Sequence, residues 1–291
     1  MHGPHLDPIA WTTGRAGESD LPFSTRLHSD IGAQATLEGF FRLCDARMCA
    51  FGPDSAARFK ALGDRLKAHP LVVTNPDGSS TEINYSIFIG ITLGAMYDSL
   101  SWEDFANVLA TLESATASPA SLGARLQPFL GGPAYITKRG FPRYSNNVEG
   151  FPAVACADSD NPHTYSAWSS AGAAEDAATG YFGRIWTWVS SICAAWPRAD
   201  ADRYTGPFTN RTANPVLVIG NQFDPATRYE GAVTASQLLP NSRLLTVHGW
   251  GHTSLFLSSC ADAVASNYLV SLALPPVGTV CEQDHVPFSM P

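Results

Sequence analysis

The sequence predicts an α/β protein in which a long, mainly helical region precedes a short segment of alternating strands and helices. Three observations lead to this fold class. Apolar residues recur at helical spacing from Ala35 to about Arg198, and from Pro215 the pattern becomes strand, helix, strand, helix. Apolar residues make up 45% of the 291 residues and charged residues 15%, which is typical of a globular chain with a sizeable core.

The helical region is expected to begin after an irregular leading segment. Residues 1 to about 35 are rich in Gly, Pro, Ser and Thr, which favour turns and loops. The next stretch, "ATLEGFFRLC", places Leu37, Phe40, Phe41 and Cys44 on one helical face. The stretch "SAARFKALGDRLKAH" repeats apolar residues at spacings of three and four. Both are therefore predicted to be helices that bury one face.

Two longer stretches complete the predicted helical region. "YSIFIGITLGAMYDSLSWEDFANVLATLESA" is predicted to hold two helices, the second beginning after Ser101 as its N-cap, with Asp104 three residues later. "SSAGAAEDAATGYFGRIWTWVSSICAAW" is predicted to be a helix that ends at Pro197, because proline cannot continue a helix.

From Pro215 the apolar runs become short. "VLVIG" and "RLLTVHG" are predicted to be strands, each followed by a helix, in "RYEGAVTASQLL" and "CADAVASNYLVSLAL". Strands that alternate with helices favour parallel pairing, because the helix carries the chain back to the start of the next strand.

Charge and hydropathy exclude several classes of partner. Acidic residues outnumber basic ones by 26 to 18, which gives a net charge of −8, and no Lys/Arg cluster occurs. Nucleic acid is therefore not an expected partner. No apolar run approaches the roughly 18 residues that a membrane span needs. No cofactor is expected either.

The cysteines bear on the compartment. They are Cys44, Cys49, Cys156, Cys193, Cys260 and Cys281. An even number without C-x-x-C spacing favours disulfides and an oxidising compartment, with six buried free thiols as the alternative. Many pairings are possible, but nearness in the chain suggests Cys44–Cys49 and Cys260–Cys281, leaving Cys156–Cys193. A secreted or cell-envelope location is expected, although "MHGPHLDPIAW" lacks the basic and apolar regions of a signal peptide.

Both predicted strands lead to a residue that can take part in proton transfer. Asp224 lies just beyond "VLVIGNQ", and His252 just beyond "LLTVHGWG". Because functional groups of an open α/β sheet collect at the carboxyl ends of its strands, we expect the two side chains to meet. A carboxylate bonded to one imidazole nitrogen fixes the tautomer, so the other nitrogen can take a proton from a nucleophile. Gly249 and Gly251 would allow the required tight turn.

Plainer interpretations exist for the same residues. Asp224, which precedes a proline, also fits an Asx turn or a helix N-cap. His248 and His252 are four residues apart, a spacing that resembles a metal-binding pair. They fall on a strand and a glycine turn instead of a helix, so no metal site is expected and His248 is interpreted as structural.

Beyond these residues, much of the chain resembles a known family. "NPVLVIGNQFDPATRYEGA", "LLTVHGWGHTSL" and "CADAVASNYLVSLALPPVGTVCEQD" resemble the C-terminal, TAP-like region of secreted α/β-hydrolase exopeptidases similar to tripeptidyl aminopeptidase and proline iminopeptidase. "LDPIAWTTGR", "PFSTRLHSDIGAQATLEGFFRLCD" and "WPRADADRYTGPF" resemble the helical cap of that group. The resemblance implies Asp224 as the acid and His252 as the base of a triad whose chain order is Ser, Asp, His.

The same resemblance implies the domain organisation. The expected fold is a partial α/β-hydrolase, with the C-terminal strands and helices of the parallel sheet and a large, mainly helical cap. Residues 1–8 would be the remnant of a core strand, residues 9–205 the cap, and residues 206–291 the TAP-like segment.

The chain departs from the family at the nucleophile. No G-x-S-x-G motif occurs in the 291 residues. The nearest stretches are "WSSAG" around Ser170 and "GSSTE" around Ser80; each lacks one glycine, and neither follows a predicted strand. The chain is therefore expected to carry the Asp and His of the triad but not the Ser, and to be inactive alone.

Two functions remain open at this point. The first is the C-terminal part of a secreted serine hydrolase, an exopeptidase that acts on peptides, or on small esters or amides, and releases short peptides or single residues from a free N-terminus. The alternative is a non-catalytic secreted binding or interaction module on a hydrolase-derived scaffold. An unusual nucleophile, Ser254, is a weaker third possibility.

Two further expectations follow from the exopeptidase interpretation. Glu149, Asp158 and Asp160 are candidate substrate-binding residues, because an aminopeptidase needs negative charge for the substrate's α-ammonium group, although solvated loop carboxylates are the simpler interpretation. Without earlier strands of the sheet, an apolar edge would be exposed, so self-association or the missing N-terminal half is expected as a partner.

Overall fold

The computed structural model describes residues 7–114, 119–130 and 147–289. The chain forms two compact units, one of residues 1–34 with 136–284 and the other of residues 35–135 with 285–291. A parallel sheet in the first unit and mainly helical structure elsewhere confirm the predicted fold class. The predicted division into core strand, cap and TAP-like segment stays a prediction. It describes regions that correspond to parts of the resembled family, whereas the two units are defined by contacts within the structure.

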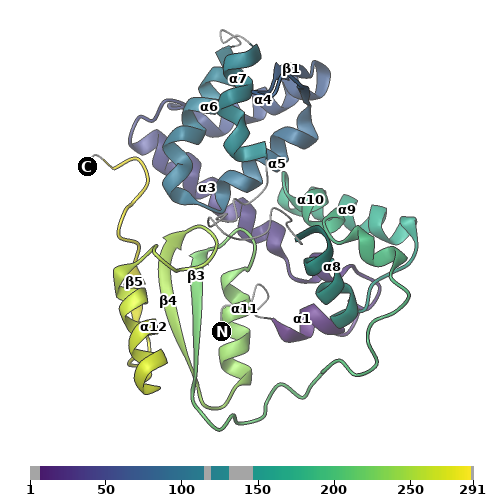
Figure 1. Cartoon of the computed structure of the whole chain (residues 1–291), viewed down its shortest axis with the longest axis vertical. Coiled ribbons are helices and arrows are strands. Elements are labelled where there is room, and N and C mark those ends of the chain that lie inside the picture. Colours follow the sequence, from purple (N-terminus) through teal and green to yellow (C-terminus); the bar gives the residue numbers. More distant parts are fainter. Residues whose placement is uncertain (1–6, 115–118, 131–146, 290–291) are drawn as a thin grey trace. The chain divides into compact units, whose positions relative to one another are not determined.

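The sheet of the first unit contains the predicted strands (Figure 1). β3 (Val216–Phe223) pairs in parallel with β4 (Ser242–Trp250), as predicted, and β4 pairs in parallel with β5 (Val280–Glu282), which the sequence analysis did not predict. α11 (Tyr229–Leu238) connects β3 to β4, and α12 (Ser259–Ser271) connects β4 to β5. Both helices agree with their predicted ranges within a few residues.

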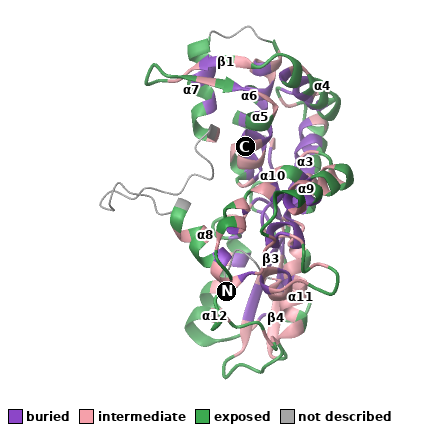
Figure 2. Cartoon of the chain, turned by 90° about the vertical axis from the view of Figure 1, so that its right-hand side faces the viewer, coloured by how far each residue is buried: buried purple, intermediate pink, exposed green. Residues whose placement is uncertain are grey.

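The two faces of β3 contact different helices. Leu217 and Ile219 line an apolar groove of about 310 Å³ whose other side is formed by α12. Gly220 faces α11 instead, where a Cβ atom at this position would lie 2.7 Å from the Cβ of Ala232. Only glycine therefore allows α11 to pack this closely on the strand. Figure 2 shows that much of α12 is exposed.

The helices of the first unit begin earlier in the chain than predicted. They are α1 (Pro8–Thr12), α2 (Phe23–Arg26), the first turns of α3 (Ser29–Ala46), α8 (Asn147–Asp158), α9 (Tyr165–Thr179), α10 (Gly183–Trp188) and the 3-10 helix η2 (Ser191–Ala195). Asp7 caps α1 by accepting hydrogen bonds from the amides of Ile9 and Ala10. The prediction of an irregular leading segment was therefore wrong. Asp7 and Pro8 start a helix and not a strand, while residues 1–6 lie outside the described residues.

The predicted single helix before Pro197 is divided. α9 ends at Thr179 because Gly180 adopts a φ of 89°, which a residue with a side chain rarely adopts. The chain then continues as α10 and η2. The glycine is in the quoted motif, but helical periodicity on both sides of it concealed the break.

A buried arginine joins several segments of the first unit. Arg26 is 1% exposed. Its guanidinium donates hydrogen bonds to the carbonyl oxygens of Ala10, Leu21, Asp160, Trp11 and Thr12, at distances of 2.7 to 3.4 Å. Burial lowers the pKa of Arg26 to about 10, against the opposing effect of Asp160 and Glu18, so the group remains charged at neutral pH.

The second unit is helical with one hairpin. Besides the rest of α3 it contains α4 (Ser55–Ala68), β1 (Leu71–Thr74), β2 (Ser80–Ile83), α5 (Tyr85–Met96), the 3-10 helix η1 (Ser99–Ser101), α6 (Trp102–Ser114) and α7 (Pro119–Leu130). β1 and β2 form an antiparallel hairpin that the sequence analysis missed. α6 begins after Ser101 as predicted, but the hydroxyl of Ser101 donates to the carbonyl oxygen of Asp98 and does not cap the helix.

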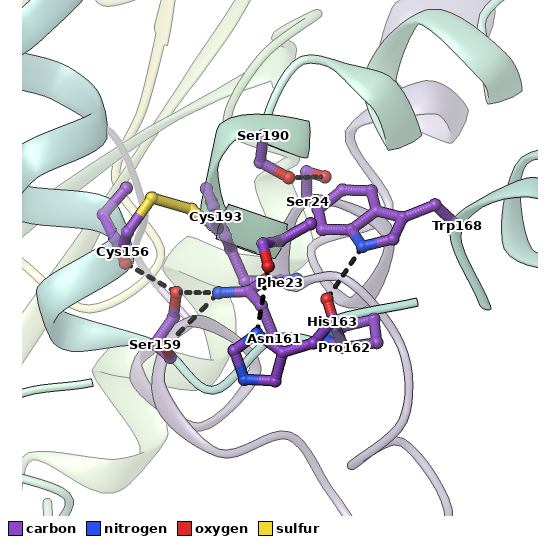
Figure 3. The surroundings of a disulfide bond; sticks show 12 residues. Phe23, Ser24, Cys156, Ser159, Asn161, Pro162, His163, Trp168, Ser190 and Cys193 are labelled. Carbon is purple, nitrogen blue, oxygen red and sulfur yellow. Dashed lines mark hydrogen bonds between the residues drawn. A yellow bond between two sulfur atoms is a disulfide. The ribbon is translucent and has the colours of Figure 1, made fainter. Parts of the chain in front are cut away.

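The structure contains the three disulfides suggested by nearness in the chain. Cys44–Cys49 lies in the second unit, and Cys156–Cys193 and Cys260–Cys281 lie in the first. Cys156 and Cys193 join α8 to η2 (Figure 3). Around them, Asn161 accepts a hydrogen bond from the amide of Phe23 at 3.0 Å. The Cys156–Cys193 disulfide therefore fixes α8 and η2, and both of its cysteines belong to the same hydrophobic cluster as Phe23 of α2.

No helix within the described ranges has both the length and the apolar character of a membrane span. The extracytoplasmic location stays a prediction, which the three disulfides support.

Candidate active site

Asp224 and His252 meet at the carboxyl ends of neighbouring strands. The ring atom Nδ1 of His252 lies 3.0 Å from Oδ1 and 3.1 Å from Oδ2 of Asp224. Asp224 follows β3 and His252 follows β4, and parallel pairing of these strands brings their ends together. The Asp224 side chain is 4% exposed and the His252 side chain 22%. The predicted contact is therefore present, with the imidazole more accessible than the carboxylate.

Further hydrogen bonds hold the Asp224 carboxylate. Oδ1 accepts from the amides of Ala226 and Thr227, at 2.8 and 2.7 Å. Oδ2 accepts from the hydroxyl of Thr227 at 2.8 Å. These bonds form the Asx turn of the plainer interpretation, and they also hold the carboxylate in one orientation towards His252. The structural and the chemical interpretations of Asp224 are thus compatible.

The turn that carries His252 is held by side chains from neighbouring strands. Asn221 on β3 donates from Nδ2 to the carbonyl oxygens of Gly251 and Thr253, at 3.0 and 2.5 Å. The amide of Trp250 donates to Oε1 of Gln283 at 2.9 Å. Gly251 has a φ of 125°, which requires glycine. Sequence reasoning identified the glycine but missed Asn221 and Gln283, which no local motif indicates.

The environment of His252 favours its charged form. Burial disfavours the imidazolium, but the hydrogen bond to Asp224 and the negative charge of that carboxylate together outweigh this effect and raise the pKa of His252. Because Nδ1 faces Asp224, Nε2 is the nitrogen that would exchange a proton with a substrate or nucleophile. The arrangement can therefore take up a proton and stabilise the resulting charge.

Replacing Asp224 with asparagine is expected to lower the pKa of His252 below the ordinary value of histidine. The substitution removes both effects that raise this pKa and leaves the effect of burial, which lowers it. The measurement is an NMR titration of the His252 ring proton in both forms of the chain. An unchanged or higher pKa in the variant would contradict the role assigned to Asp224.

The pair should also make stability depend on pH. A histidine whose pKa is raised on folding stabilises the fold below its unfolded pKa, and this contribution disappears as pH rises through the folded pKa. The difference in unfolding free energy between the parent chain and Asp224→Asn should therefore be largest near about pH 5 and shrink towards about pH 9. Urea unfolding across this pH range measures the difference in unfolding free energy. A difference that grows with pH would contradict a raised pKa of His252 as its cause.

The first turn of α3 packs against the loop that carries Asp224. The hydroxyl of Ser29 donates to the carbonyl oxygen of Ala226 at 2.6 Å. A Cβ atom on Gly32 would lie 2.4 Å from the carbonyl oxygen of Asp224, closer than any side chain can approach. Gly32 therefore sets the distance between the helix and the acid loop.

Replacing Gly32 with alanine is expected to destabilise the chain by about 1 to 3 kcal/mol, because the new methyl group forces backbone apart. The movement of the acid loop should also weaken the Asp224–His252 contact and lower the pKa of His252. Gly94→Ala is a matched control, since its Cβ would meet nothing closer than 3.6 Å in another helix. Equal behaviour of the two variants in urea unfolding and NMR titration would refute the prediction.

The other predicted residues lie in different surroundings. Glu149 is exposed, Asp158 accepts a bond from the indole of Trp11 at 3.3 Å, and Asp160 pairs with Arg203 at 2.7 Å. Ser254 is 3% exposed, and among the described residues no hydrogen bond joins its hydroxyl to His252. His248 pairs with Glu282 at 2.7 Å across β4 and β5, which agrees with a structural role.

A second group of titratable side chains lies at the start of α3. His28, Asp30 and Glu175 bring their nitrogen and oxygen atoms within 4.8 Å of one another, and we call them the His28 cluster. Burial, the hydrogen bond with Asp30 and the charge of Asp30 raise the pKa of Glu175 to about 7. Asp30 belongs to the same helical turn as Ser29, which contacts the acid loop. Sequence reasoning missed this cluster because its members are far apart in the chain.

Comparison with known proteins finds a family model that matches the segment containing this site. The model of the TAP-like protein family matches residues 177–281, which include Asp224 and His252. Residues 177–281 are therefore similar to the TAP-like proteins of the α/β-hydrolase group. The match confirms the resemblance to a TAP-like hydrolase, whereas the exopeptidase role and the missing serine stay predictions.

Several hydrolases are similar to all or part of this chain. Carboxylesterase B of Mycobacterium tuberculosis is 27% identical over 270 residues, 89% of this chain and 49% of the relative. Serine protease Hip1 of the same organism is 38% identical over 68 residues, 23% of this chain and 13% of the relative. Tripeptidyl aminopeptidase of Streptomyces lividans is 26% identical over 123 residues, 42% of this chain and 23% of the relative. The chain spans about half the length of the mycobacterial carboxylesterase that it matches.

Proposed function

We propose that this chain supplies the acid and the base of a serine exopeptidase that removes short peptides or single residues from a free N-terminus. The observation that carries the proposal is the hydrogen bond between buried Asp224 and the more accessible ring of His252. The likeness to tripeptidyl aminopeptidase supports a peptide substrate, and the likeness to carboxylesterase B keeps small esters as alternative substrates.

The relay would work through a serine on polypeptide outside the 291 residues. Nε2 of His252 takes the proton of the serine hydroxyl as its oxygen attacks the scissile carbonyl carbon, and Asp224 stabilises the imidazolium. His252 then gives this proton to the leaving amine as the C–N bond breaks, which leaves an acyl-enzyme. Water deprotonated by His252 hydrolyses the ester and restores the serine. We propose the polypeptide that carries the serine as the partner of this chain.

An exopeptidase also needs a negative charge for the substrate's α-ammonium group. The roles suggested for Glu149, Asp158 and Asp160 stay predictions, and the last two already have polar partners. Asp30 and Glu175 suit the role better, because buried Asp30 lies on the helix that packs against the acid loop, and half-buried Glu175 of α9 forms an acidic pair with it. We therefore include ammonium recognition by this pair in the proposal.

The test uses the chain together with the polypeptide encoded upstream of Met1, which should contain a G-x-S-x-G motif in frame. A fluorophosphonate probe should label the serine of the combined protein and leave the 291-residue chain unlabelled. Labelling of the chain alone would point to Ser254 or another nucleophile. An upstream sequence without the motif, and no labelling in either form, would favour the non-catalytic binding module.

Substrate choice is tested with matched peptide anilides. The combined protein should cleave a tripeptide anilide with a free N-terminus and not its N-acetylated form. Asp30→Asn should lower kcat/KM for the free peptide by about tenfold or more, because a charged hydrogen bond is lost. Hydrolysis of a small neutral ester serves as the control, since it needs no ammonium contact. Equal cleavage of free and acetylated peptides would overturn the exopeptidase assignment.

A further inference from the structure

The His28 cluster brings together three side chains that can ligate a metal ion. Asp30 lies on the first turn of α3, Glu175 on the last turn of α9, and His28 directly before α3. All belong to the first compact unit. Their ligand atoms are an imidazole nitrogen and two carboxylate oxygens, all within 4.8 Å of one another. We propose that the His28 cluster binds a divalent transition-metal ion, with Zn²⁺ as the best fit.

The donor set selects the class of metal. Mg²⁺ and Ca²⁺ prefer oxygen ligands alone and in larger number, whereas a nitrogen ligand with carboxylates suits Zn²⁺ and its neighbours. Ligand atoms of a tetrahedral zinc site lie roughly 3.3 Å apart, so the cluster needs only a modest contraction. His28 and Glu175 are half-buried and can supply this movement, while Asp30 is fixed. Water would complete the coordination.

The charge around the cluster is a second, independent observation. Asp30 is 1% exposed, and Oδ2 of this residue accepts a hydrogen bond from the hydroxyl of Thr179 at 2.7 Å. Two adjacent carboxyl groups in such a place must hold a proton or a cation, because both cannot be ionised without compensation.

Other carboxylates of the first unit show what is missing from the cluster. Asp176, next to Glu175 on α9, has Arg184 as its ion-pair partner, and Asp160, elsewhere in the unit, has Arg203. Within the described part of the chain, neither Asp30 nor Glu175 forms an ion pair with Lys or Arg. The position therefore lacks a basic group where its neighbours have one, and a bound cation would supply the missing charge.

A bound metal ion and a substrate ammonium group would compete for the same two carboxylates. Metal binding can nevertheless be measured without substrate, serine or catalysis, so the two proposals are tested separately. Zinc binding without peptidase activity would support this inference and contradict the proposed function. Peptidase activity without zinc binding would support the proposed function and contradict this inference.

Calorimetric titration of Zn²⁺ into the metal-stripped 291-residue chain tests the proposal. One saturable site is expected, and Co²⁺ in its place should give the visible absorption of a nitrogen- and oxygen-ligated ion. His28→Gln and Glu175→Gln should each weaken zinc binding by about tenfold or more. Circular dichroism and melting of each variant show whether the fold is kept.

His248→Gln is the matched control. His248 also contacts a carboxylate, that of Glu282, but it lies outside the His28 cluster and offers zinc one ligand fewer. This variant should bind zinc like the parent chain. The proposal is overturned if no saturable binding occurs, if His248→Gln removes it, or if folded His28→Gln and Glu175→Gln variants bind zinc unchanged.

Discussion

Replacing Arg26 with leucine is expected to lower the free energy of unfolding by about 5 kcal/mol, the upper range for removing one partner from a buried charged contact. Five carbonyl oxygens each lose a hydrogen bond in this variant, although that of Thr12 keeps the amide of Asp160 as a donor. Arg26 is 1% exposed, so water cannot readily replace the guanidinium. Those carbonyls come from the α1 region, from Leu21 and from Asp160. The loss should therefore loosen the contact between the N-terminal segment and the end of α8.

Urea unfolding of the parent chain and the variant measures this effect. Arg26→Lys is the appropriate control, because it keeps the positive charge but cannot donate in the five directions of a guanidinium. It should fall between the parent and Arg26→Leu. Two variants of equal stability would show that the fork of donors, and not the charge, matters. If the unfolding free energy of Arg26→Leu lay within about 1 kcal/mol of the parent value, Arg26 would not have the structural role assigned to it.

Replacing Cys156 and Cys193 with serine is expected to lower the free energy of unfolding by about 4 kcal/mol. The bond links residues 37 positions apart, so it removes much of the freedom of the unfolded chain. The same double substitution at Cys44 and Cys49, which are 5 positions apart, should cost about 2 kcal/mol.

Chemical unfolding under non-reducing conditions compares the two serine pairs. The decisive result is their order, because both variants lose a bond of the same chemistry and differ in the length of the closed loop. A larger loss for the Cys44–Cys49 variant would mean that native contacts, and not loop closure, determine the contribution.

The predictable part of the fold rests on strong local signals. The strands β3 and β4 were found because each is a short apolar run followed by turn residues, and α4 because its apolar residues repeat at helical spacing. β5 and the β1–β2 hairpin were missed, since three or four residues carry too little periodicity to be distinguished from loops. The start of α3 was missed because Ser29 and Gly32 suit loops in isolation, and here contact the acid loop instead.

Some residues of the candidate site could also be predicted from the sequence, and others could not. Asp224 and His252 could be predicted because each follows a strand in a recognisable local pattern. Asn221, Gln283 and the His28 cluster could not, because tertiary structure alone joins residues from distant parts of the chain. Acidic residues chosen by position, such as Asp160, already have an ion-pair partner.

The order of the strands determines where this sheet can grow. β5 pairs along only three residues and is tied to α12 by the Cys260–Cys281 bond, whereas β3 is eight residues long and, within the described ranges, pairs with β4 alone. Additional strands would therefore be added beside β3, which leaves β4 and β5 at the far margin of an extended sheet. The Asp224–His252 pair would then lie near one end of that sheet, and the serine of the proposed function would approach it from the β3 side.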